Sequence, residues 1–215
     1  MRGRRSGKRC TPRVAWQVPK VEMRSVPRHA ASAMATATFL LCVGAQKAGT
    51  TWLHRYVSGD SGAAAALMKE FHVWNMLYPT PGEPPILFEG QAAPQRHALH
   101  DAMIDRPELY FDYFDALLDG DGKRLATDMT PAYAGLPAEA FERIRDGFKS
   151  RGISVRVVFL MRDPVERCWS AVRMYRQKGL PIPGVPEALG EEAALRAYCR
   201  TAHTHQHGRY DKTVA

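Results

Sequence analysis

An apolar run that leads directly into a glycine-containing loop is the feature that most constrains this chain. Residues 39–43 (FLLCV) have the length and composition of a buried strand, and the residues after the loop have those of a helix. The loop itself contains Gly44, Lys47 and Gly49. Glycine lets a backbone turn tightly and bring its N–H groups close to a phosphate, and a helix N-terminus adds free N–H groups and a partial positive charge. The sequence therefore predicts a phosphate-binding loop at residues 44–51.

The position of the lysine separates this loop from that of the common ATP- and GTP-binding proteins. A Walker A loop, GxxxxGK[ST], has its lysine directly after the second glycine. Here Lys47 precedes Gly49, which gives GxxKxGTT. A P-loop kinase or NTPase, with residues 157–163 as its Walker B strand, is therefore the less favoured interpretation.

A second strand, turn and helix occur at residues 158–170 (VFLMRDPVERCWS), about a hundred residues after the first loop. Pro164 suits the first turn of a helix. Arg162 ends the strand and Ser170 stands two turns into the helix, so a guanidinium and a hydroxyl group can converge on one anion. The two segments together predict two anion-binding sites.

These two segments resemble the phosphate-binding motifs of the sulfotransferases that use 3'-phosphoadenosine-5'-phosphosulfate (PAPS). The first resembles the motif that binds the 5'-phosphosulfate, and the second resembles the 3'-phosphate motif RDPxxRxxS. The resemblance implies an enzyme that transfers a sulfuryl group from PAPS to a hydroxyl or amine, with a glycan or small molecule as acceptor and with no metal. It also implies a set of residues that bind PAPS: Gly44, Lys47, Ala48, Gly49, Thr50, Thr51, Trp52, Arg162 and Ser170.

Catalytic residues are expected between the two motifs, in residues 68–74 (MKEFHVW). This stretch is similar to a Lys-Glu-x-His-aromatic segment of the glycan-modifying sulfotransferases, which implies that Glu70 is the general base and that Lys69 contacts the acceptor. Sulfuryl transfer needs a base for the acceptor proton and a cation for the charge that builds on the leaving phosphate, for which we predict Lys47. His72 is the second candidate base, because imidazole titrates near neutral pH.

Residues 127–133 (TDMTPAY) resemble the E-K-T-P-x-Y segment that lines the acceptor cleft in this family. The resemblance implies that Thr130 and Tyr133 are acceptor-site residues. Asp128 and Met129 stand where the family commonly has glutamate and lysine. The missing lysine argues against a strongly anionic sugar as acceptor.

Three histidines near the end of the chain do not predict a metal site. His203, His205 and His207 alternate, so they would share one face of an extended segment. No acidic residue or cysteine stands beside them to complete a set of ligands. We interpret this stretch as a polar terminal segment.

The positive charge of the chain is concentrated at its start. The formal net charge is +8, and it falls within residues 1–38, while residues 39–215 carry equal numbers of acidic and basic residues. This distribution argues against a nucleic-acid-binding surface on the folded part. The composition of residues 1–38 is typical of an organelle transit peptide and equally of a disordered leader. Without a run of about 18–20 apolar residues, we expect a soluble domain, or a Golgi-lumen enzyme whose anchor lies outside this sequence.

The order of strand and helix patterns predicts an α/β fold, with a P-loop-containing parallel sheet, helices on both faces and a sulfotransferase-like architecture. We place it in residues 39–215 as one domain. The predicted strands are 39–43, a weak one at 64–68 for which a helix is the alternative, 125–128, and 154–161 as the central strand. The predicted helices are 50–58, stretches of 95–118 broken at Pro107, 137–149, 164–178 and 187–201.

The resemblance covers about residues 39–210. Members of the family continue beyond a Gly-x-Tyr turn, here residues 208–210, into a basic loop that closes over the nucleotide, and this chain ends five residues later. We therefore expect a domain without its C-terminal part, and a catalytically impaired homologue that binds PAPS or its product is the alternative function. Acceptor contacts are expected from the loops at residues 79–91 and 180–186.

Overall fold

The computed structural model describes residues 36–79, 94–120, 122–208 and 210–213. Residues 1–35 of the predicted leader and nearly all of the first predicted acceptor loop lie outside the described residues, whereas Thr38, the last residue of that leader, begins the first strand. The chain divides into two units, Met1–Met34 and Ala35–Ala215, and everything below concerns the second.

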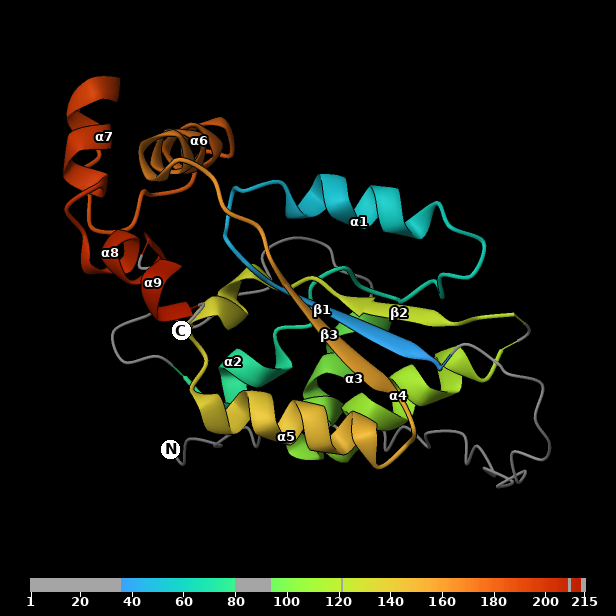
Figure 1. Ribbon diagram of the computed structural model, residues 1–215. Helices are drawn as coiled ribbons and strands as arrows, with labels where there is room; N and C mark the ends of the chain where they lie inside the picture. The colour runs from blue at the N-terminus through green and yellow to red at the C-terminus, as the bar shows by residue number, and fades with distance from the viewer. Residues whose placement is uncertain (1–35, 80–93, 121, 209, 214–215) are drawn as a thin grey trace, which may run out of the picture. The chain divides into compact units, whose positions relative to one another are not determined.

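In the part of the chain that the structure describes, three parallel strands form the sheet: β1 (Thr38–Gly44), β2 (Leu125–Asp128) and β3 (Ser154–Phe159), in the order β2-β1-β3. In the register of the sheet, Leu41 stands opposite Asp128 on one side and Val157 on the other. Parallel neighbours require crossover connections, and helices provide them (Figure 1). The chain is thus an α/β protein with a small open parallel sheet, as the alternation of patterns predicts.

Two strand predictions are wrong. Residues 154–161 were expected at the centre of the sheet, but β1 is central and β3 lies at the edge of the sheet that the described residues form. A parallel strand is apolar because helices cover its faces, so its composition does not report how many strands flank it. Residues 64–68 form neither a strand nor a helix; Ala63 makes an isolated bridge to Leu125, and the alanines that follow have low β-propensity.

Most predicted helices are present with nearly the predicted bounds. The expected break at Pro107 separates α3 from α4, while the helix expected at 187–201 is shorter because it begins after Gly190. The histidines at 203 and 205 lie in a helix and not in an extended segment. The helices are α1 (Thr50–Ser58), α2 (Val73–Leu77), α3 (Pro94–Asp105), α4 (Glu108–Leu118), the 3-10 helix η1 (Pro131–Gly135), α5 (Ala138–Lys149), α6 (Pro164–Gln177), α7 (Glu191–Tyr198), α8 (Ala202–Gly208) and α9 (Tyr210–Thr213).

Aromatic side chains hold β1 against the helices on one side of the sheet. Figure 1 shows α3, α4 and α5 on this side and α1 on the other. Phe39 of β1 lies 4.0 Å from Phe148 of α5 and 4.7 Å from Phe114 of α4, measured between ring centroids, and all three are fully buried. This packing fixes β1, and therefore the loop that follows it.

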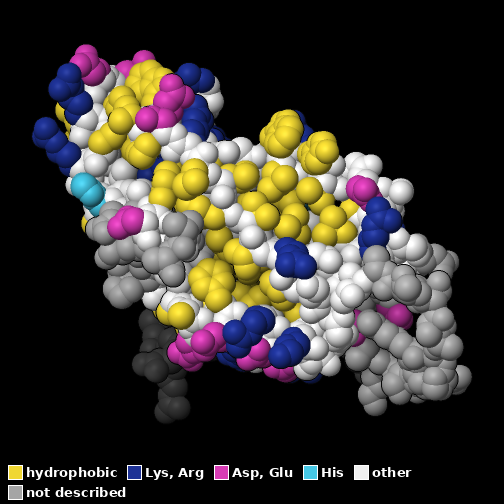
Figure 2. All heavy atoms as spheres, viewed as in Figure 1, with side chains coloured by type: hydrophobic (Ala, Val, Ile, Leu, Met, Phe, Trp, Pro, Cys, Tyr) yellow, Lys and Arg dark blue, Asp and Glu magenta, His cyan; other side chains and the backbone are white. Residues whose placement is uncertain are grey.

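Hydrophobic side chains gather on the face of the molecule where β3 lies, as Figure 2 shows. Val157 on β3 is 56% exposed. Between β3 and α5 is an apolar hollow of about 400 Å³, lined in part by Leu41, Phe141 and Val155. None of the residues that line it is a predicted site residue, so the hollow is separate from the chemistry considered below.

Replacing Gly147 with alanine should destabilise the fold, although alanine is the better helix former. An added Cβ would overlap the ring of Phe111, which is buried. The gain in helix propensity is about 1 kcal/mol, whereas forcing a methyl group into a packed core costs about 1–3 kcal/mol. We expect a net loss, measured as a lower urea midpoint.

The matched control is Gly120→Ala, where the added Cβ would lie 3.6 Å from its nearest neighbours, an ordinary van der Waals contact on the surface. It should leave the free energy of unfolding unchanged or raise it by up to about 1 kcal/mol, because alanine restricts the unfolded chain. A Gly147→Ala protein that is more stable than the parent would contradict the described packing of α4 against α5.

Candidate active site

The two predicted anion-binding loops lie side by side beyond the carboxyl ends of β1 and β3. The backbone N–H of Ala45 donates to the Leu160 carbonyl at 2.8 Å, and the N–H of Leu160 donates to the Gly44 carbonyl at 2.7 Å. Nη1 of Arg162 donates to the backbone carbonyl of Lys47 at 3.1 Å. Segments far apart in the sequence therefore meet at the edge of a parallel sheet, where ligands of open α/β proteins bind.

Positive backbone φ angles coincide with predicted site residues. Gly49, at the start of α1, has φ 106°, a conformation that a side chain would strain. Among the residues that the structure describes, the non-glycine residues with positive φ are Lys47 (65°) and His72 (56°). Such conformations cost energy and occur most often at functional sites, so this coincidence supports a functional role for both residues.

The N-terminus of α1 is open to an anion, and that of α6 is not. No side chain caps α1, and its first turn contains no acidic residue. The first N–H groups of any helix have no partner within it, so those of α1 are available to a ligand. At α6, Oδ1 of Asp163 accepts from the N–H of Glu166 at 2.9 Å. Of these two helix starts, that of α1 is the one that can accept an anion.

Basic side chains converge on Lys47. Burial lowers the pKa of Lys47, and the positive charges of Lys178, Arg162 and Lys69 lower it further. Repulsion of this kind is relieved when an anion binds among the cations. Lys178 was not predicted as a site residue, because a lysine just after a helix does not by itself indicate a binding site in the sequence. Its approach to Lys47 depends on how α6 packs.

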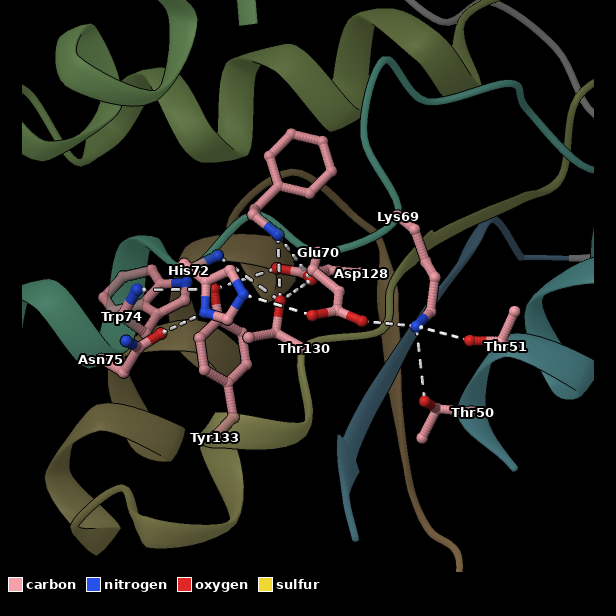
Figure 3. A network of polar contacts seen from close by, with 11 residues as sticks. Thr50, Thr51, Lys69, Glu70, His72, Trp74, Asn75, Asp128, Thr130 and Tyr133 are labelled. Carbon is pink, nitrogen blue, oxygen red and sulfur yellow. Dashed lines mark hydrogen bonds and ion pairs between the residues drawn. The ribbon is translucent and has the colours of Figure 1, made fainter. Parts of the chain in front are cut away.

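A chain of polar contacts connects α1 with both candidate bases, as Figure 3 shows. Nζ of Lys69 donates to the hydroxyl oxygens of Thr51, at 3.2 Å, and Thr50, at 3.4 Å, and it forms an ion pair with Glu70. The other carboxylate oxygen of Glu70 lies 3.2 Å from Nε2 of His72. Lys69 was predicted as an acceptor contact, and in the structure it bridges the phosphate loop and the candidate base.

Glu70 is surrounded by groups that stabilise its charged form. Burial opposes ionisation of this carboxyl, but hydrogen bonds from His72 and Lys69 and the charges of these two groups outweigh burial, so the pKa of Glu70 lies below its usual 4.5. Glu70 is therefore a carboxylate at neutral pH. It can accept a proton readily only when Lys69 turns to another partner, and an incoming phosphate is such a partner.

Thr130 and Tyr133, predicted to line an acceptor cleft, are both fully buried. Their hydroxyl groups donate to the carboxylate of Asp128, at 2.5 Å from Thr130 and 3.1 Å from Tyr133. The hydroxyl of Thr130 also accepts from the backbone N–H of Phe71 at 3.0 Å. Both residues thus lie beneath the segment that carries Glu70 and do not reach solvent in this structure.

The remaining predicted residues differ in exposure. Trp52 is 68% exposed and stacks on Tyr56 of the same helix, with ring centroids 5.5 Å apart. Ser170 is half-buried on α6. The second arginine of the RDPxxRxxS segment, Arg167, is fully buried, and its Nη2 donates to the Thr204 carbonyl at 3.3 Å. Arg167 therefore joins α6 to α8, whereas Arg162 stands at the site.

Comparison with known proteins leaves the function to be inferred from the residues themselves. No protein-family model and no curated protein sequence matches the chain. Within the described residues, no group of three or more His, Cys, Asp or Glu side chains is placed to hold a metal ion. No helix in the same part of the chain is long and apolar enough to cross a membrane.

Proposed function

We propose that this chain is a sulfotransferase-like P-loop protein that transfers a sulfuryl group from PAPS to a hydroxyl or amine acceptor. The observation that carries the proposal is the hydrogen bond from Arg162 to the backbone of Lys47. It places the Lys47 loop and the Arg162 loop together at adjacent strand ends, where Nη2 of Arg162 also pairs with Glu166 at 2.8 Å. A nucleotide with phosphate groups on both its 3' and 5' sides matches such a pair of loops, whereas ATP lacks the 3'-phosphate.

The proposed binding residues form two groups, one for each end of the nucleotide. The free N–H groups of α1, Lys47 and the hydroxyl groups of Thr50 and Thr51 would hold the 5'-phosphosulfate. Arg162 and Ser170 would hold the 3'-phosphate. A guanidinium has five N–H donors, so Arg162 can bind a phosphate while its Nη1 stays on the Lys47 carbonyl. Lys178 adds positive charge that the sequence pattern alone does not assign to the site.

The contacts of Glu70 support a transfer step in which this residue is the base. Glu70 takes the proton of the acceptor hydroxyl or amine, the acceptor atom forms a bond to sulfur, and the bond from sulfur to the 5'-phosphate oxygen breaks. Negative charge builds on that phosphate, where Lys47 stabilises it. Lys69 can move from Glu70 toward the same phosphate, which frees the carboxylate to accept the proton. The products are the sulfated acceptor and 3'-phosphoadenosine-5'-phosphate (PAP).

A thermal-shift comparison of PAP, ADP and Mg-ATP tests this proposal. A ligand that binds only the folded state stabilises it by RT ln(1 + [L]/Kd), about 2.7 kcal/mol at a hundredfold excess over Kd. We expect PAP to raise the melting temperature and the other two nucleotides to have little effect. Stabilisation by Mg-ATP alone would overturn the proposal in favour of a P-loop kinase or NTPase.

Transfer of radiolabelled sulfate from PAPS to a panel of glycans and phenols then separates an enzyme from a binding protein. Stabilisation by PAP without transfer to any acceptor would favour the alternative, a homologue that binds the nucleotide without turnover.

A further inference from the structure

Asp128, at the carboxyl end of β2, is a fully buried carboxylate whose described hydrogen-bond partners are all neutral groups. Its Oδ2 accepts from the hydroxyl groups of Tyr110, at 2.8 Å, and Tyr133, at 3.1 Å. Its Oδ1 accepts from the hydroxyl of Thr130 at 2.5 Å. An ionised group is costly to bury, so a buried carboxylate with only neutral hydrogen-bond partners is expected to have a structural or functional role.

Through Thr130, this carboxylate holds the segment that carries the candidate bases (Figure 3). Thr130 gives its single hydroxyl proton to Asp128, which leaves its oxygen to accept from the backbone N–H groups of Phe71, at 3.0 Å, and His72, at 3.4 Å. The N–H of Phe71 also lies 3.3 Å from Oδ1 of Asp128.

The same segment is also hydrogen-bonded on the N-terminal side of Glu70. The N–H of Met129 donates to the carbonyl of Lys69 at 2.9 Å. The backbone on both sides of Glu70 is therefore hydrogen-bonded to the end of β2. These contacts also hold His72 in its left-handed conformation, with φ 56°, which is unfavourable for a residue with a side chain.

We propose that Asp128 and Thr130 are positioning residues that hold Glu70 and His72 against the phosphate loop. The inference rests on the proposed function, since it assigns Glu70 a part in the transfer. Neither residue need touch the acceptor, because each acts through the backbone of residues 69–72. A displacement of about 1 Å at a reacting group lowers a rate by about a hundredfold, so the loss of this anchor should be visible in turnover.

The variant that tests the anchor is Thr130→Val, which keeps the shape of the side chain and removes its hydroxyl. The rescue is Thr130→Ser, which restores the hydroxyl. We expect Thr130→Val to lower kcat by about 10- to 100-fold with unchanged PAP affinity, and Thr130→Ser to recover most of the rate. Hydrogen exchange at the amides of Phe71 and His72 should become faster in Thr130→Val and return toward the parent value in Thr130→Ser, with α1 unchanged.

The outcomes separate this inference from the function on which it rests. If the parent protein transfers no sulfate, the proposed function fails, and hydrogen exchange still shows whether Thr130 holds the segment. Unchanged exchange in Thr130→Val overturns the anchor. Faster exchange with an unchanged kcat, in a protein that does transfer sulfate, overturns the positioning role.

Asp128→Asn supplies a second readout, the pH dependence of stability. Burial raises the pKa of Asp128 from its usual 3.8 to about 6, partly offset by its hydrogen bonds. The folded state therefore holds the proton more tightly than the unfolded state, and the contribution of Asp128 to stability falls as pH rises from about 4 to about 6. The titratable groups that face this site are Tyr110 of α4, Tyr133 of η1, Cys42 of β1, and Lys69, Glu70 and His72 of the supported segment.

Asparagine keeps an oxygen for Thr130 and cannot ionise. The stability of Asp128→Asn relative to the parent should therefore increase between pH 4 and pH 6 and stay level above this range, while Asp128→Ala loses the anchor at every pH. A difference between Asp128→Asn and the parent that does not change with pH would contradict the assignment of a buried, ionisable carboxylate at this position.

Discussion

Replacing Glu70 with glutamine is expected to lower the kcat of sulfuryl transfer by about 10²- to 10⁴-fold and to leave the affinity for PAP unchanged. Glutamine has nearly the same shape and can still accept a hydrogen bond from Lys69 or His72, but it cannot take a proton. The described contacts that hold Glu70 come from Lys69 and His72, its neighbours in the sequence. Initial rates with saturating PAPS, together with PAP affinity by calorimetry, measure both quantities.

The pH profile distinguishes Glu70 from the second candidate base. Because the pKa of Glu70 lies below its usual 4.5, this group is ionised throughout the neutral range, and its own titration should reduce the rate only below about pH 4.5. A rate that already falls at a higher pH than this would point away from Glu70 as the base. Full activity in Glu70→Gln, with loss of activity in His72→Gln, would show that the base is His72.

Replacing Arg162 with alanine should remove the preference of the protein for a 3'-phosphate. Loss of charge-assisted hydrogen bonds of about 1.5–3 kcal/mol corresponds to an affinity for PAP about 10- to 100-fold lower. Affinity for adenosine 5'-phosphate, which lacks the 3' group, should change little. Lys47→Ala should weaken the binding of both nucleotides, because Lys47 belongs to the 5' end. Calorimetric titration of each variant with each nucleotide measures the four affinities.

Arg145→Ala is the matched control for the loss of a positive charge. Arg145 lies on α5 with its side chain 60% exposed, and it pairs with its neighbour Asp146. Its removal should alter neither affinity by more than the small general effect of net charge, which salt screens. An equal loss of affinity for both nucleotides in Arg162→Ala would show that this guanidinium does not bind the 3'-phosphate.

The conformation of residues 39–51 was predictable because it is local. A buried strand, glycines at positions of positive φ and a helix start are all encoded within residues 39–51, and β1 and α1 occur there as predicted. The helix after Pro164 was predictable for the same reason, since proline favours the first turn. Such features depend on neighbours along the chain and not on the packing of distant segments.

Features that depend on packing were missed. The sequence predicted Thr130 and Tyr133 near the acceptor, but their burial beneath Phe71 and His72 results from the pairing of β2 with β1. Asp128 appeared only as a departure from a family pattern, yet it is the centre of the buried hydrogen-bond network. Its neighbours in the sequence give no sign that Tyr110, from α4, donates to it.

The edge position of β3 has a similar cause. Its apolar composition predicted a central strand with both faces covered, but none of its residues is buried and Val157 is exposed. The approach of Lys178 to Lys47 likewise depends on the direction in which α6 leaves the sheet. Neither property has a counterpart in the local pattern of residues.

The most direct measurement of the central claim, that the Lys47 loop and the Arg162 loop hold opposite ends of one nucleotide, is calorimetric titration of the unaltered protein with PAP and with adenosine 5'-phosphate. We expect one PAP per chain, bound at least about tenfold more tightly than adenosine 5'-phosphate, because only PAP engages both loops. Equal affinities for the two nucleotides, or no binding of PAP at millimolar concentration, would contradict it.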